Sequence, residues 1–374
     1  MFALATFGLG FVTRPVGALV IGTYSDRVGR RPAMLLSFTM MGLAIVVLAL
    51  TPSYASIGIA APIIIIIARL VQGLSLGGEV GPTTAYLLEA APLAKRGATV
   101  AWQPASQQIA ATTGALVGWI LTQVMSPAAL QSYGWRIAFL IGGLTLPFGL
   151  WLRSNLPETI HLAEGNESEK QRDESASAIS SNVRLLVLGL IIVASGTIIT
   201  YVTQYMTTYA ERTLRVAPSL AFATTLVANA AGIAAAICGG RLVDRIGRWP
   251  VMIWPQIVVL FATLPVFLWI VQTRSAWALL SGLGALSLVN SLPYVAFYVA
   301  FAESLPKRIR GRSFATVYAV AVATFGGTAQ LVVAWLTHAT GSALAPAWYM
   351  VVATAIGLFA MLKLGETSRK HVNE

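Results

Sequence analysis

Three polar side chains interrupt one long apolar run, residues 61 to 88, and their spacing points to shared chemistry. Gln72 and Glu79 are seven residues apart, which places them within about 20° of one helix face, with Arg69 about 60° from Gln72. A guanidinium can bind a carboxylate through two parallel hydrogen bonds. A carboxyl group in apolar surroundings favours its neutral form and can carry a proton. Arg69 and Gln72 are therefore candidate anion ligands and Glu79 a candidate proton carrier, with a structural ion pair as the alternative.

Other polar stripes follow helical spacing. Gln103, Ser106 and Gln107 follow the i, i+3, i+4 pattern of one helix face. Hydroxyl and amide groups can bind a polar solute, and the alternative role is hydrogen bonding between helices. The second half of the chain carries a longer stripe and a four-residue repeat, whose candidate ligands are Tyr201, Gln204, Tyr205, Thr208, Asn290 and Tyr294.

A loop sequence occurs twice. The run from Gly22 to Pro32, which contains Asp-Arg-Val-Gly-Arg, returns 218 residues later from Gly240 to Pro250 as Asp-Arg-Ile-Gly-Arg. Further echoes keep nearly this spacing, since Arg96-Gly97 matches Arg310-Gly311 and Trp135 matches Trp348. The chain therefore contains an internal repeat, which is typical of a protein built from two related halves.

An aspartate at a helix end, beside several arginines, can accept charge-assisted hydrogen bonds and interact with the dipole of a neighbouring helix. Breaking and remaking such bonds can hold one conformation. The alternative is a basic loop that only sets the orientation in the membrane. The candidate gating residues are Arg14, Asp26, Arg27, Gly29, Arg30, Arg31, Asp244, Arg245, Gly247 and Arg248.

The composition excludes several classes of protein. Of 374 residues, 56% are hydrophobic and 10% are charged, with a mean hydropathy of +0.74, whereas soluble domains carry roughly 25% charged residues. The net charge of +11 does not indicate a nucleic-acid partner, because the basic residues lie between apolar runs rather than on one face. A single Cys238 and three scattered histidines favour neither a disulfide framework nor a metal site. No catalytic residues, phosphate-binding loop or cofactor is predicted.

Apolar runs of membrane-spanning length predict eleven spans in an all-helical membrane protein. Lys and Arg gather in alternate connections, which the positive-inside rule assigns to the cytoplasm together with the C-terminus. The predicted spans are residues 1 to 22, 33 to 50, 61 to 88, 98 to 124, 137 to 153, 185 to 209, 218 to 240, 251 to 271, 276 to 302, 314 to 336 and 346 to 362.

The repeat predicts the domain organisation. Residues 1–153 form an N-terminal bundle, residues 154–184 a polar cytoplasmic linker, and residues 185–374 a C-terminal bundle with a short cytoplasmic tail. Two spans precede the Asp-Arg-x-Gly-Arg loop in the second half but only one does in the first. The repeat therefore predicts a twelfth helix that is missing before Met1.

The doubled loop, set in two six-helix halves, resembles the major facilitator superfamily. Within that superfamily, Arg14-Pro15, Arg69-Leu-Val-Gln72-Gly73, Gly78-Glu79 and Trp135-Arg136 resemble the metabolite:proton symporter family. The segments from Trp102 to Gln108 and from Thr207 to Thr213 look like parts of bacterial citrate-proton symporters. The chain departs from the family in lacking its first helix and in having Pro104 within the Gln-containing stretch.

The resemblance implies two pseudo-symmetric bundles of family helices 2–6 and 7–12 around a midplane site. It also implies proton-coupled transport of a small organic acid, most closely citrate, across a bacterial inner membrane, with no cofactor and a monomeric chain in the lipid bilayer. It links Arg69 to proton coupling and the two loops to a cytoplasmic gate. Alternatives are another metabolite such as a dicarboxylate, shikimate, betaine or proline, an uncoupled exchanger, and a truncated remnant that no longer transports.

Two other side chains are given structural roles. Glu303, beside Lys307 and Arg308, is predicted to form a solvated ion pair. Tyr209 fits an aromatic belt at the membrane surface. An intramembrane enzyme would need a metal cluster or a nucleophile with a base at matching depth, and the sequence offers neither.

Overall fold

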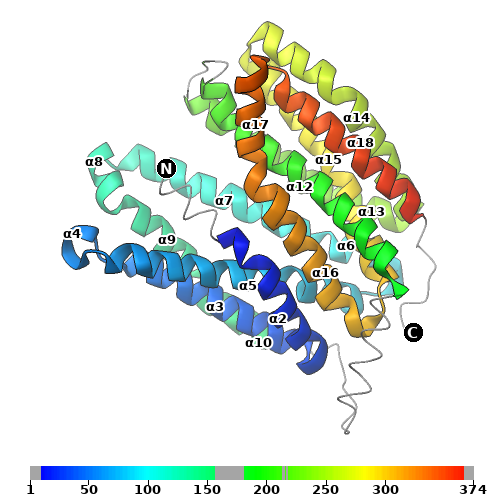
Figure 1. Cartoon of the computed structure of the whole chain (residues 1–374), viewed down its shortest axis with the longest axis horizontal. Coiled ribbons are helices and arrows are strands. Elements are labelled where there is room, and N and C mark those ends of the chain that lie inside the picture. Colours follow the sequence, from blue (N-terminus) through cyan, green and yellow to red (C-terminus); the bar gives the residue numbers. More distant parts are fainter. Residues whose placement is uncertain (1–9, 156–180, 213–214, 216–217, 366–374) are drawn as a thin grey trace. The chain divides into compact units, whose positions relative to one another are not determined.

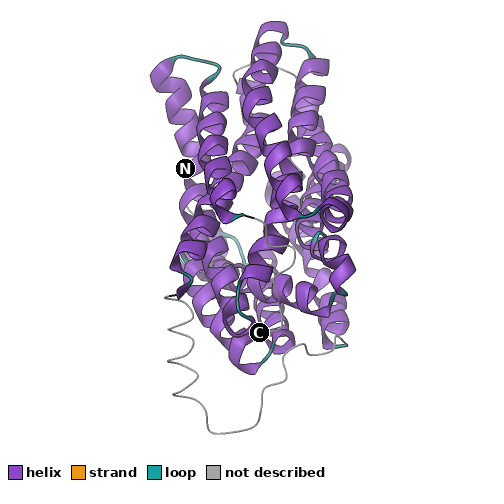
Figure 2. Ribbon diagram, turned by 90° about the vertical axis from the view of Figure 1, so that its right-hand side faces the viewer, coloured by secondary structure: helices purple, strands orange, loops and turns teal. Residues whose placement is uncertain are grey.

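The computed structural model describes residues 10–155, 181–212, 215 and 218–365. Helices joined by short loops make up this part of the chain, and it contains no strand (Figure 2). A helix satisfies its own backbone hydrogen bonds, which a chain in hydrocarbon requires because no water is available there. The predicted all-helical class is confirmed.

Nine of the described helical segments are long and apolar enough to cross a membrane. The predicted first span lies partly outside the described residues, and the predicted span 98–124 is helical but carries the polar Gln-containing stripe. The count of eleven remains a prediction. The nine segments are Arg30–Leu50, Ala60–Ala90, Ser132–Leu152, Val183–Met206, Ala223–Ile246, Arg248–Thr273, Ala276–Ser304, Ile309–Thr340 and Ala345–Leu364.

Contacts divide the chain into two compact units, each assembled from segments distant in sequence. The first unit consists of Met1–Glu89, Thr113–Ser180 and Pro306–Ala323. Its described helices are α2 (Arg14–Val28), α3 (Arg30–Leu50), α4 (Tyr54–Ile57), α5 (Ala60–Ala90), α8 (Pro127–Ala129), η2 (Leu130–Gly134), α9 (Trp135–Gly143), α10 (Thr145–Ser154) and α16 (Lys307–Ala321).

Small residues allow the helices of the first unit to pack closely, as is usual for membrane helices. A methyl group on Gly17 of α2 would collide with the backbone of Leu74 in α5. On the other side of α2, Ala18 packs with Ala315 and Ala319 of α16 in a fully buried cluster. Helix α2 is thereby fixed against both α5 and α16, with the loop that follows it beside the start of α16.

The second unit consists of Ala90–Thr112, Ser181–Leu305 and Thr324–Glu374. Its core gathers apolar residues such as Val202, Phe267, Leu283 and Met350 from five helices, and α14, α15 and α18 run side by side (Figure 1). The remaining helices are η1 (Leu93–Lys95), α6 (Arg96–Val100), α7 (Trp102–Val124), which continues into the first unit, α12 (Val183–Arg212), α13 (Pro218–Ile246), α14 (Arg248–Thr273), α15 (Ala276–Ser304), η3 (Val322–Gly326), which begins in the first unit, α17 (Gly327–Thr340) and α18 (Ala345–Leu364).

The units do not follow the order of the sequence repeat. Residues 90–112 of the first half pack with the second unit, and residues 306–323 of the second half pack with the first. These segments are equivalent in the repeat, because Arg96-Gly97 and Arg310-Gly311 are 214 residues apart. Each half therefore contributes the same element to the other unit. The bundle boundaries at 153 and 185 remain predictions, and most of the predicted linker lies outside the described residues.

Candidate functional site

Glycine makes the sharp turn in both copies of the repeated loop. Gly29, between α2 and α3, has a φ of 136°, and Gly247, between α13 and α14, has a φ of 95°. Residues with a Cβ rarely adopt such angles, so glycine is the residue these turns require. Each turn sets the arginine that begins the next helix, Arg30 or Arg248, close to the end of the preceding helix.

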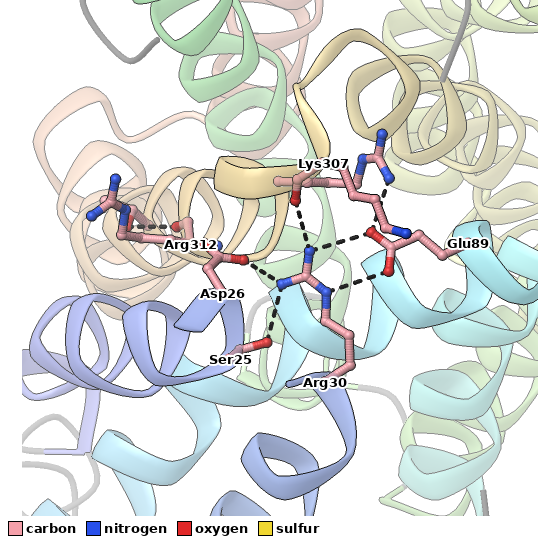
Figure 3. A network of polar contacts seen from close by, with 8 residues as sticks. Ser25, Asp26, Arg30, Glu89, Lys307 and Arg312 are labelled. Carbon is pink, nitrogen blue, oxygen red and sulfur yellow. Dashed lines mark hydrogen bonds and ion pairs between the residues drawn. The ribbon is translucent and has the colours of Figure 1, made fainter. Parts of the chain in front are cut away.

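Asp26, in the last turn of α2, binds two partners in the first unit. Its carboxylate accepts a hydrogen bond from the Arg30 guanidinium and another, 2.9 Å long, from the backbone N–H of Arg312 in α16 (Figure 3). Burial raises the pKa of the Asp26 carboxyl above its ordinary value of 3.8, and the positive charge of Arg30 opposes that rise. Gly311 permits this approach, because a methyl group there would collide with Arg30.

Arg30 is 0% exposed and is the centre of the first network. Besides Asp26, it donates to Glu89 of α5, with Nη2 and Oε1 3.3 Å apart, and to the backbone carbonyl of Lys307, 3.1 Å away (Figure 3). Glu89 also accepts from Arg310 of α16, 2.9 Å away. Two buried guanidiniums are thus matched by two carboxylates. We call Asp26, Arg30, Glu89, Arg310 and the N–H of Arg312 the first network.

The second unit repeats this arrangement. Asp244 of α13 accepts hydrogen bonds from the backbone N–H groups of Gly97, at 2.6 Å, and Ala98, at 2.9 Å. Glu303 of α15 binds Arg248 through both carboxylate oxygens, at 2.9 and 3.1 Å, and also contacts Arg96 at 3.6 Å. We call Asp244, Arg248, Glu303, Arg96 and the N–H groups of residues 97 and 98 the second network.

Each network joins residues from both halves of the repeat. Asp26, Arg30 and Glu89 of the first half bind Arg310 and Arg312 of the second. Asp244, Arg248 and Glu303 of the second half bind residues 96 to 98 of the first. Buried charges are tolerated only when they are paired, so removing one partner is expensive. Such networks can hold one conformation and release it when water reaches the charges.

The other predicted gating residues lie differently. Arg27 and Arg245 are exposed. Arg31 donates to the backbone carbonyl of Ser154 at the end of α10. Arg14 lines a cavity between α2 and α5 together with Arg69.

Sequence reasoning missed Glu89 and placed Glu303 wrongly. Glu303 is 5% exposed and is bound to Arg248 and Arg96, so its predicted solvated ion pair with Lys307 and Arg308 is wrong. Lys307 and Arg308 are near Glu303 only in the sequence, whereas Arg248 and Arg96, which bind its carboxylate, come from other helices. One signal was available, because Glu89 precedes Glu303 by the same 214 residues that separate Arg96 from Arg310.

The first unit contains a cavity of about 170 Å³ between α2, α3 and α5. Arg69 and Gln72 line it, as the helical spacing predicted, and Arg69 donates to the Gln72 amide oxygen at 3.1 Å. Arg14 lies in the same lining. Glu79 is half-buried further along α5, beyond Leu76, the last residue of that helix in the lining. The structure thus brings Arg69 and Gln72 together and sets Glu79 about two helical turns beyond Gln72 on the same helix.

The Gln-containing stripe of α7 is divided by burial. Gln103 is buried, with its amide oxygen unpaired among the described atoms, while Ser106 and Gln107 are exposed. Ala101 and Ala105 face α13 and α15 in a small apolar cluster. The i, i+3, i+4 spacing therefore relates one residue at a helix contact, Gln103, to two residues on an exposed face, Ser106 and Gln107.

The stripe on α12 lies opposite the core of the second unit. Tyr201 and Thr208 are half-buried and Gln204 is exposed, whereas intervening residues such as Val202 and Met206 are buried. Tyr205 packs at the edge of that core. Tyr209 is buried and donates a 2.6 Å hydrogen bond to the carbonyl of Ala343, so its role is to join α12 to the loop before α18.

Asn290 and Tyr294 of α15 differ in their polar contacts. The hydroxyl oxygens of Tyr294 and Ser195 in α12 are 3.4 Å apart. Asn290 is buried, with its amide oxygen unpaired among the described atoms. Tyr294 therefore contacts a neighbouring helix through the hydroxyl that was predicted to bind a ligand. Across the described residues, no group of three or more His, Cys, Asp or Glu side chains is arranged to hold a metal ion.

The whole chain is similar in sequence to known membrane transporters. The sequence profile of the Major Facilitator Superfamily matches residues 1–329. A citrate-proton symporter from Klebsiella pneumoniae is 34% identical over 361 residues, which cover 96% of this chain and 81% of that protein. An ectoine/proline transporter from Corynebacterium glutamicum is 30% identical over 384 residues, covering 97% of this chain and 75% of that protein.

The fold also matches a solved transporter structure. The proton:xylose symporter XylE, bound to 6-bromo-6-deoxy-D-glucose, superposes with a TM-score of 0.78 over 97% of this chain and 86% of that one. At 16% identity this likeness concerns the fold alone. The family profile and the relatives agree with the doubled Asp-Arg-x-Gly-Arg loop, and this multi-pass membrane protein belongs to the Major Facilitator Superfamily.

Proposed function

We propose that this chain is a proton-coupled symporter of a small organic acid, most closely citrate or a related tricarboxylate, in a bacterial inner membrane. The observation that carries the proposal is the arginine-lined cavity of the first unit, in a chain that is 34% identical to a citrate-proton symporter. Arg69, held by Gln72, offers a guanidinium to a carboxylate. A guanidinium is a suitable ligand for an anion, and burying it in a membrane without a partner of opposite charge costs free energy.

Alternating access of two bundles, residues 1–153 and 185–374, is the proposed mechanism. The two networks form its gate. They stabilise one state because their arginines are buried and paired with carboxylates. The gate opens when the segments 90–112 and 306–323 move away from the residues that they contact in this state. The excess of Lys and Arg in alternate loops supports a cytoplasmic position for this gate and for the C-terminus.

Proton coupling is assigned to Glu79 together with Arg69. Glu79 is a half-buried carboxyl group on α5, the helix that also carries Arg69 and Gln72 of the cavity lining, and it is the proposed proton carrier. The other proposed substrate ligands belong to the second unit. They are Tyr201, Gln204, Tyr205 and Thr208 of α12, Gln103, Ser106 and Gln107 of α7, and Asn290 and Tyr294 of α15.

Uptake into proteoliposomes tests this function. We expect labelled citrate to accumulate when an inward proton gradient is imposed and to stop accumulating when a protonophore removes it. Glu79→Gln should abolish gradient-driven accumulation while citrate counterflow continues. Gradient-independent citrate uptake by the wild type would contradict proton coupling, and the absence of counterflow with any carboxylate would contradict the substrate class.

A zwitterionic osmolyte is the second candidate substrate, because the ectoine/proline transporter is 30% identical over nearly the whole chain. Competition distinguishes the two. Unlabelled proline or ectoine should leave citrate counterflow unchanged if the organic-acid proposal holds. Proline uptake that citrate does not inhibit would favour the zwitterion.

A further inference from the structure

The cavity of the first unit has a one-sided charge. Its described lining consists of two arginines, one glutamine and five residues without charge, and contains no carboxylate. The lining residues are Gly10, Phe11, Arg14, Met41, Arg69, Gln72, Gly73 and Leu76. Two guanidiniums that share a small apolar space repel each other, and this repulsion grows as the local dielectric falls. An anion between them would remove the repulsion.

Arg14 is prepared to bind more than it does in this state. Its guanidinium carbon lies 4.0 Å from the centre of the Phe11 ring, which fixes the plane of the group. Its Nε atom is buried and has no hydrogen-bond partner among the described atoms. Buried donors in native proteins are nearly always paired, so an unpaired one calls for a ligand, a water or an ion.

Arg69 presents the second guanidinium from the opposite helix. It donates to the Gln72 amide oxygen at 3.1 Å and lies 5.7 Å from the ring of Phe139. The two helices that carry the arginines approach closely, because a methyl group on Gly77 of α5 would collide with the backbone of Arg14 in α2. The Arg14 guanidinium is therefore held by an aromatic neighbour, and the Arg69 guanidinium by an amide and an aromatic neighbour.

We infer that Arg14 and Arg69 bind two carboxylates of one substrate, which makes the chain selective for di- and tricarboxylates over monocarboxylates and zwitterions. This inference rests on the proposed function and assigns Arg14 to the substrate site rather than to the gate. A charge-assisted bidentate contact from each arginine requires two carboxylates.

The cavity also disfavours a substrate that carries its own cation. A quaternary or secondary ammonium needs a carboxylate or a free aromatic face. The described lining has no carboxylate, and its aromatic ring, Phe11, already faces Arg14. The volume of about 170 Å³ is below the roughly 300–1,000 Å³ of sites that enclose a drug-sized ligand. It therefore suits the carboxylate-bearing end of a small acid.

Competition with a chain-matched pair of acids tests the inference. Glutarate and pentanoate have the same carbon chain and differ by one carboxylate. Their inhibition of labelled citrate counterflow gives a selectivity ratio. For the wild type we expect glutarate to inhibit at least about tenfold more strongly, the effect of one charged hydrogen-bonding contact. Direct binding of glutarate and of pentanoate to the purified protein, by calorimetry, gives the same ratio without transport.

Arg14→Gln should reduce this ratio to about one to three, because pentanoate still uses Arg69 while glutarate loses its second contact. Arg14→Lys keeps the charge but loses the planar fork, so it should lower the ratio by about threefold and serves if the glutamine variant does not fold. Lys363→Gln removes an equal charge from an exposed position at the end of α18 and should leave the ratio unchanged.

A wild-type selectivity ratio retained in either folded Arg14 variant would overturn the inference even if citrate transport is confirmed. A wild type that binds no carboxylate at all would instead refute the proposed function, so the two failures are distinguishable. Proline or glycine betaine binding that competes with glutarate, and survives in Arg14→Gln, would also contradict the two-carboxylate site.

Discussion

Glu89→Gln tests whether the first network holds a conformation. The substitution removes the carboxylate charge shared by Arg30 and Arg310, which are 0% and 1% exposed. Breaking a buried ion pair by removing one partner costs about 3–5 kcal/mol. Glutamine keeps one acceptor, so the lower end, about 3 kcal/mol, is the better guide. A state in which water reaches the arginines does not bear this cost.

The equilibrium should therefore shift toward the open state by about two orders of magnitude, since 1.4 kcal/mol corresponds to a factor of ten. Cysteine labelling measures this shift. Ala315 of α16 is fully buried against α2, so a cysteine there reacts with maleimide only after the helices separate. The exposed Cys238 must first be replaced by serine. The labelling rate should then rise about 100-fold in Glu89→Gln.

A second reporter separates opening from unfolding. Ala353 of α18 is 5% exposed in the core of the second unit. A cysteine at this position should react at the same rate with and without Glu89→Gln. Equal acceleration at both positions would mean general destabilisation, and an unchanged rate at position 315 would refute the reasoning about the buried charges.

Asp26→Asn should open the first network, and the maleimide labelling rate of Ala315→Cys reports this opening. Asp244→Asn should open the second network, reported by the labelling rate of Ala236→Cys, and its rate should rise by a smaller factor. Gly247→Ala should lower the free energy of unfolding by about 1–3 kcal/mol because of its positive φ. Gly118→Ala, at an open position inside α7, should instead leave stability unchanged or raise it by up to about 1 kcal/mol in the same thermal melt. Tyr209→Phe should lower Tm by a few degrees, through loss of its hydrogen bond to Ala343 worth about 1 kcal/mol, and should leave citrate counterflow at the wild-type rate.

Apolar runs and basic loops were sufficient to predict the class of fold, because a membrane helix shows its length and limits directly in the sequence. They were less informative for the stretch from Trp102 to Val124. That helix forms as predicted, but its glutamines and threonines make it less apolar than the nine clear spans. The exchange of equivalent segments between the two units was not predicted. A repeat shows which segments correspond to each other, but it does not show which helices each segment contacts.

The candidate site shows the same limit. Helical spacing placed Arg69 and Gln72 correctly in one lining. Arg14 joins them from another helix, and no periodicity within one segment relates residues of two helices. Glu89 escaped notice because it ends an apolar helix and has no charged neighbour until Lys95. Its role follows from the repeat only when each carboxylate of one half is compared with its counterpart in the other.

The two networks contain equivalent residues of the repeat but distribute the charges differently. In the first, Arg30 bonds to both Asp26 and Glu89, so neutralising either carboxylate weakens the pairing of the same buried cation. In the second, Arg248 is paired with Glu303, while Asp244 binds two backbone N–H groups. Backbone donors carry only partial charges, so neutralising Asp244 leaves Arg248 and Arg96 paired as before. The aspartate of the repeated loop is therefore part of an ion-pair network in the first half, as Asp26, and caps the start of α6 in the second half, as Asp244.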